Sequence, residues 1–453
     1  MNQIVKRDLW FHRSTWMWTF AALLVCSTCV GTVFASAASV GASIAKTGSE
    51  AMELELQSLV SVLMSFIGIT ACAVIATNAR LAVLAQSRSH ALWKILGMPS
   101  GKVRRIVLAQ VALLAAIAGA FASILAPAFS ILYVHTWAET GLPVSGPPAY
   151  SPSVLFGTIL LTIAFALTGA WRPAKRAAKV DELQALRDAA MPTSSVTKSA
   201  LTSGICLLGM AGLCFFTGVI DGIYKDGEPD AIVAGMLMLL AAALALSAWT
   251  LPAVLACWSS LIRTKDLAWH LARAAVRQRT AQSISASLPY ALAISLIGTL
   301  YGSVAAAGVE AQGIGMVLGL ILPICIAGGM GTVAMFGTQR RSDSRMLHTL
   351  GVPRAQINRA NALEGASYGV TGLVFGWFFT LASSLVGSIL LGMPVMAGLS
   401  YLPWGLLTVL TLCCLGVPTL TAVGSGWVTY EPESTTFLRD RRKSSRTAES
   451  RVQ

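Results

Sequence analysis

The stretch IVLAQVALLAAIAGAFASILAPAFSILY, residues 106–133, decides the fold of this chain because it holds no charged residue. A helix that crosses the hydrocarbon core of a bilayer needs about 20 mainly apolar residues. The segment just before it, residues 91–105, reads ALWKILGMPSGKVRR and is strongly basic. The two together predict a membrane-spanning helix that emerges from a basic, water-facing segment.

The composition extends this pattern to the whole chain of 453 residues. Hydrophobic residues make up 55% of the chain and charged residues 12%, whereas a soluble protein carries roughly 25% charged residues. The net charge of +13 does not indicate nucleic-acid binding, because Lys and Arg lie in short clusters between apolar stretches. The sequence therefore predicts an all-α, polytopic membrane protein with no nucleic-acid partner.

Ten stretches have the length and apolar character of a membrane span. They cover residues 15–38, 56–79, 106–133, 153–171, 200–220, 231–261, 283–307, 312–336, 360–390 and 403–424. The first ends near Ala35-Ser36-Ala37, as a signal peptide would. It is longer than the usual apolar core of about 7–15 residues, so we favour a retained first helix.

The basic residues predict the orientation of these spans. All Lys and Arg except Lys46 and Lys225 lie at the two ends of the chain or in loops after even-numbered spans. Basic loops are retained on the cytoplasmic side, so we expect both termini to be cytoplasmic. The basic tail, residues 429–453, is expected to contact anionic lipids.

The sequence also predicts an internal repeat. Residues 345–359, RMLHTLGVPRAQINR, align with residues 91–105 at an offset of 254, so that Leu, Gly, Pro and Arg coincide. The predicted divisions are a first four-span repeat at 1–190, two linking spans at 191–265, a second four-span repeat at 266–428 and the tail. Two linking spans leave both repeats in the same orientation, which is a parallel repeat.

Each repeated segment is predicted to form a stiff, amphipathic elbow on the cytoplasmic surface. Apolar residues recur at helical spacing over residues 88–96, with basic residues on the other faces. Gly97 and Gly351 suit the left-handed residue that ends a helix, and Pro99 and Pro353 suit the first turn of the next one. These elbows could equally be interfacial helices without any partner.

The repeated segments resemble the FtsX-like permease family of ABC transporters, in particular its MacB- and BceB-type permeases. In that family an acidic residue lies eight positions before the glycine, and a Glu begins the next helix. Asp343 and Glu364 fill these places in the second repeat, whereas Ser89 and Gln110 replace them in the first. The large extracellular domain of the BceB type is absent, since only about residues 307–313 are available for it.

The resemblance implies a permease that binds a separate ATPase dimer through two coupling helices, at about 87–98 and 341–352. ATP and Mg would then belong to the partner, and this chain would hold no cofactor, metal or catalytic residue. The sequence agrees, because it contains no G-x-x-x-x-G-K-[ST] motif. The predicted contacts with the ATPase are Arg88, Leu92, Trp93, Leu96, Gly97, Asp343, Met346, Leu347, Leu350 and Gly351.

The cargo implied by the resemblance is an amphipathic, peptide-like or lipid-like compound that the complex exports or extracts from the membrane. Two other functions stay open from the sequence. One is a proton-coupled secondary transporter, which would need acids within the membrane, and the other is a signalling subunit that only transmits force. Glu364 is the one acid near a span interior; we interpret it as a structural group rather than a substrate or proton site.

Overall fold

The protein is described from a computed structural model that places residues 2–47, 50–138, 151–178, 198–224, 230–262, 264–307, 314–390, 394 and 402–427. Every regular element in these residues is a helix. The first group is α1 (Asn2–Phe11), α2 (Arg13–Thr47), α3 (Glu50–Ala85), α4 (Ser87–Ile95), α5 (Ser100–Ala138) and α6 (Pro152–Ala177). Then follow α8 (Lys198–Tyr224), α9 (Asp230–Leu261), α10 (Leu267–Gln278), α11 (Thr280–Ala307), α12 (Ile314–Met335), α13 (Gly337–Thr349), α14 (Arg354–Leu390) and α16 (Trp404–Trp427).

The predicted polytopic, all-α fold is confirmed. Nine helices of the described residues are long and apolar enough to cross a membrane, namely α2, α3, α5, α6, α8, α9, α11, α14 and α16. The remaining predicted span corresponds to α12, whose described apolar part, Gly319–Met335, is shorter. Most of these helices extend beyond the predicted apolar stretches, because a helix can continue into the polar interface once its centre is in the hydrocarbon core.

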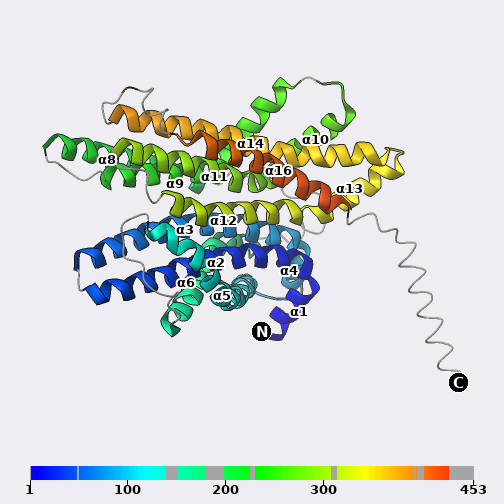
Figure 1. The fold of residues 1–453 in the computed structure, drawn as a ribbon. Helices are drawn as coiled ribbons and strands as arrows, with labels where there is room; N and C mark the ends of the chain where they lie inside the picture. The colour runs from blue at the N-terminus through cyan, green and yellow to red at the C-terminus, as the bar shows by residue number, and fades with distance from the viewer. Residues whose placement is uncertain are drawn as a thin grey trace.

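The helices form two packed groups that meet along α12 (Figure 1). In the first group α2 packs against α3, α5 and α6, and α6 also packs against α3 and α5. In the second group α11 packs against α12, α14 and α16, and α16 also packs against α12 and α14. The packing of α2, α3, α5 and α6 is therefore repeated, in the same order, by α11, α12, α14 and α16.

The linking helices lie on the outside of the second group. Helix α8 packs against α9, and α9 packs against α11 and α14 (Figure 1). The described side chains of α8 include several exposed apolar residues, such as Leu213 and Phe216. Such a face suits contact with lipid chains, which are as apolar as the side chains themselves.

The two groups approach closely where α12 crosses α2 and α3. A Cβ atom on Gly328 would lie 2.4 Å from the side chain of Val74, so only glycine fits there. The thiol of Cys29 on α2 donates a hydrogen bond to the carbonyl oxygen of Leu320 on α12, at 3.2 Å. Small residues at such a crossing let two backbones pack tightly without a hydrophobic driving force.

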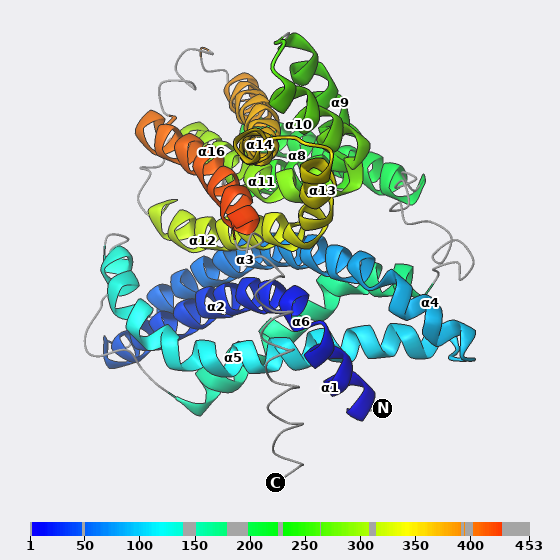
Figure 2. The same ribbon diagram turned by 90° about the vertical axis from the view of Figure 1, so that its right-hand side faces the viewer.

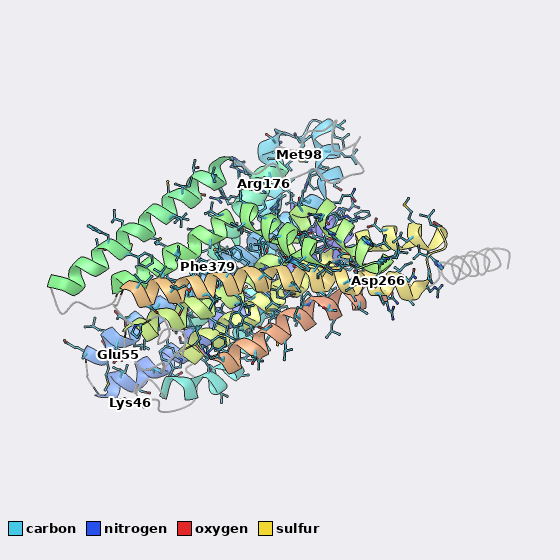
Figure 3. All side chains as sticks on the ribbon, turned by 90° about the horizontal axis from the view of Figure 1, so that it is seen from above. Lys46, Glu55, Met98, Arg176, Asp266 and Phe379 are labelled. Atoms are coloured by element: carbon cyan, nitrogen blue, oxygen red, sulfur yellow. The ribbon has the colours of Figure 1, made fainter. Side chains whose placement is uncertain are left out.

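The short helices α4 and α13 lie at the same end of the bundle, as Figure 2 shows by looking onto that end. In Figure 3, Met98, Arg176 and Asp266 lie toward this end, and Lys46 and Glu55 lie at the opposite end. These five residues thus lie at the ends that the positions of the basic residues predict. The cytoplasmic location of this end is a prediction from the basic residues.

Candidate functional site

The two predicted elbows are real turns between long helices. The first elbow, residues 87–99, consists of α4 and the turn that leads into α5. The second elbow, residues 337–353, consists of α13 and the turn that leads into α14. Helix α13 begins at Gly337, earlier than the boundary near residue 341 that was predicted for the second coupling helix. The reason is that α13 follows α12 after only one residue.

Both elbows turn at a left-handed glycine, as predicted. In the described part of the chain, Gly97 and Gly351 alone have a positive φ, and both angles are +87°. The amide of Gly97 donates to the carbonyl of Lys94 at 2.9 Å, and the amide of Met98 donates to that of Trp93 at 2.9 Å. These two bonds form a Schellman motif, which satisfies the last carbonyl groups of the helix.

The second elbow repeats these bonds at positions 254 residues later. The amide of Gly351 donates to the carbonyl of His348 at 3.0 Å, and the amide of Val352 donates to that of Leu347 at 3.1 Å. Pro99 and Pro353 directly precede α5 and α14, one residue earlier than predicted. Their carbonyl groups accept the first hydrogen bonds of those helices, so each turn is joined rigidly to the span that follows it.

Each elbow exposes apolar side chains at equivalent positions. Leu92 is 49% exposed and Leu96 83% exposed in the first elbow. Met346 is 68% exposed and Leu350 71% exposed at the matching positions of the second. Exposed apolar groups that cluster at a polar end of a protein mark surfaces for interaction.

The other predicted contacts have mixed environments. Trp93 and Leu347 are half-buried, and the Trp93 ring packs edge-on against the ring of His90 with 5.3 Å between centroids. Asp343 is about half exposed and forms an ion pair with Arg279 at the end of α10. The side chain of Arg88 lies outside the described residues.

A buried polar cluster fastens the second elbow to α14. The guanidinium of Arg340 on α13 donates to Glu364 Oε1 at 3.0 Å, and the Tyr368 hydroxyl donates to the same oxygen at 2.6 Å. The side chains of Arg340 and Glu364 are only 3% and 8% exposed. Burial alone would lower the pKa of Arg340, but its charge interactions and hydrogen bonds with Glu364 and Tyr368 together raise this pKa above its usual value.

In the first group of helices, the positions equivalent to Arg340 and Glu364 carry neutral residues. Gln86 and Gln110, which align with Arg340 and Glu364, are buried to 2% and 0% exposure. His90 is also fully buried in this elbow. Burial, and then the nearby His12, lowers the pKa of His90 to about 4, so this imidazole is neutral at pH 7.

Sequence reasoning did not identify Arg340 or Tyr368 as partners of Glu364. The spacing of Glu364 and Tyr368, i and i+4 on one helix, was a usable signal. The pairing with Arg340 was not, because it depends on how α13 folds back onto α14. No group of three or more His, Cys, Asp or Glu side chains that could hold a metal ion occurs among the described residues.

The match to a known protein family covers the first elbow and the helices next to it. Residues 59–181 match the family model described as FtsX-like permease C-terminal. This region contains α4, α5, α6 and most of α3. No curated protein matches the chain. Over residues 59–181, the chain is therefore similar to FtsX-like permeases.

Proposed function

We propose that this chain is the membrane permease subunit of an ABC transporter and that its two elbows bind a separate cytoplasmic ATPase dimer, one ATPase copy to each elbow. The family match supports a permease subunit of this general kind. The observation that carries the proposal is the pair of apolar patches, Leu92 with Leu96 and Met346 with Leu350, at one end of the bundle. Two similar patches suit the two similar subunits of a dimeric motor.

The elbows are built to pass on force. Each short helix is joined through a hydrogen-bonded turn to the helix that follows it, α5 or α14. The second is also fixed to α14 by the buried contact between Arg340 and Glu364. A movement of the ATPases toward each other would therefore displace α5 and α14, the longest helices of their groups.

The proposed cargo is an amphipathic, peptide-like or lipid-like compound that is exported or extracted from the bacterial cell membrane. The exposed apolar surfaces of the spans are compatible with cargo that arrives from the lipid. The ion pair of Glu364 with Arg340 supports a structural role for this acid over a proton-carrying one. A transport assay in sealed vesicles distinguishes this function from that of a subunit that only transmits force and moves no cargo itself.

Co-purification with the ATPase tests the elbows directly. Leu96→Asp and Leu350→Asp each place a charge in one apolar patch. Each is expected to reduce capture of the ATPase at least tenfold, because a few residues carry most of the binding energy of an interface and the contacts around them carry little. Leu54→Asp is the matched control, because Leu54 is 68% exposed and lies beside Glu55 at the opposite end. Undiminished capture by both elbow variants would refute the proposed interface.

A further inference from the structure

The first elbow lacks the charged pair that fastens the second one. Gln110 on α5 stands where α14 carries Glu364, and Gln86 stands where the second elbow carries Arg340. Both glutamine side chains are buried, and a buried amide needs hydrogen-bond partners.

Helix α1 supplies a carboxylate at this place. Gln110 donates through Nε2 to Asp8 Oδ2 at 2.7 Å. The Asp8 side chain is only 9% exposed, although Asp8 lies near the beginning of the chain. A short bond to an ionised acceptor in a partly dehydrated site is stronger than a neutral one.

The same helix also reaches the short helix of the first elbow. His12, which follows the end of α1, has its Nε2 atom 3.8 Å from Asp8 Oδ1 and 3.4 Å from the Ser89 hydroxyl on α4. Ser89 occupies the position that Asp343 occupies in the second elbow. There the partner is Arg279 at the end of α10, the helix that precedes the second group as α1 precedes the first.

From these contacts we infer that α1 is a strap that positions the first elbow, and that Asp8 holds this elbow against α5 as Glu364 holds the second against α14. The polar series Gln110, Asp8, His12 and Ser89 joins α5, α1 and α4. Asp8 is thus a positioning residue that acts through Gln110 and His12. The inference rests on the proposed coupling role of the elbows for its functional meaning.

Amide hydrogen exchange of the full-length permease in lipid nanodiscs, without any ATPase, tests the strap. Asp8→Ala is expected to raise the exchange rate of residues 87–98 roughly tenfold, because local opening sets the protection of such amides. Residues 341–352 are expected to keep their rate in the same molecule. Glu364→Gln is the matched variant and is expected to give the reverse pattern.

A rescue variant separates positioning from general damage. Gln86→Arg with Gln110→Glu installs the charged pair of the second elbow, and in the Asp8→Ala background it is expected to return residues 87–98 to within about twofold of their original rate. Unchanged exchange in Asp8→Ala, equal acceleration of both elbows, or no rescue would each overturn the inference. Because no ATPase is present, these results are independent of whether the Leu96→Asp variant loses its ATPase.

Discussion

The two elbows share one backbone but are fastened in different ways. Their turns have the same φ of +87° at Gly97 and Gly351 and the same pattern of hydrogen bonds. The second is held by a buried ion pair within its own group of helices, whereas the first is held by the bond between Gln110 and Asp8 of the strap α1. A turn set by local sequence is therefore kept while the tertiary contact that fastens it is replaced.

The largest expected effect is at the buried pair of the second elbow. Arg340→Ala leaves Glu364 charged and without its cation, which is expected to reduce the free energy of unfolding by roughly 3–5 kcal/mol. Thermal unfolding of the purified protein in detergent measures this loss. Arg340→Gln with Glu364→Gln installs the residues of the first elbow and is expected to recover most of the stability. A double variant as unstable as Arg340→Ala would contradict the explanation that the loss comes from the unpaired charge of Glu364.

Acidification is expected to loosen the first elbow more than the second. The pKa of His90 is lowered to about 4, below the value near 6.5 of an unfolded chain, so the unfolded state binds more protons between these two values. The contribution of neutral His90 to the free energy of unfolding is complete above about pH 6.5 and falls as the pH drops toward 4. The loss is on the order of 2 kcal/mol by pH 5.

Hydrogen exchange at pH 5 and pH 7, corrected for the intrinsic rates, measures this effect in residues 87–98. His90→Ser installs the residue that the second elbow carries as Ser344 and is expected to remove the pH dependence. The acidic and basic groups near His90 include His12 and, through it, Asp8. If His90→Ser kept the full dependence on pH, His90 would not be its source.

A smaller and equal effect is expected at the two glycines. A Cβ atom would meet nothing within 4 Å at either Gly97 or Gly351, so alanine there disturbs only the left-handed backbone. Gly97→Ala and Gly351→Ala are each expected to destabilise their turn by about 1–2 kcal/mol. Chemical unfolding of both variants tests whether the two losses in the free energy of unfolding are equal. Unequal losses would show that the contacts that fasten each elbow also affect its turn.

The smallest effect is expected at the ion pair of Asp343 with Arg279. Because Asp343 is about half exposed, water and salt screen this pair, and Asp343→Asn is expected to cost less than about 1 kcal/mol. Thermal unfolding at low and high salt measures it. A much larger loss that salt does not change would place Asp343 among the main anchors of the second elbow.

Several features could be predicted from the sequence because they depend on local or one-dimensional patterns. The spans follow from the length of the charge-free stretches, and their helices occur where the sequence places them. The turns follow from the Leu-Gly-x-Pro segments, because only glycine readily adopts the left-handed conformation that ends a helix there. The separation of basic loops to one end follows from where Lys and Arg lie in the chain.

The anchors depend on contacts between residues far apart in the chain. Asp8 and Gln110 are 102 positions apart, and their bond exists only because α1 lies against α5. Sequence reasoning registered the missing acid at Gln110 but not its replacement, since an isolated Asp near the start of a chain has no spacing that indicates a partner. Likewise, the acid predicted at Glu364 needed the fold to bring Arg340 beside it.

By itself, the sequence determined that this chain crosses a membrane many times and turns sharply at two related glycines. Both properties arise from the free energy of placing each residue in hydrocarbon or in a left-handed turn, which needs no distant neighbour. The tertiary structure alone decided which side chains the elbows expose and what fastens each of them. Those properties depend on contacts between different helices, and such contacts form only when all the helices have packed together.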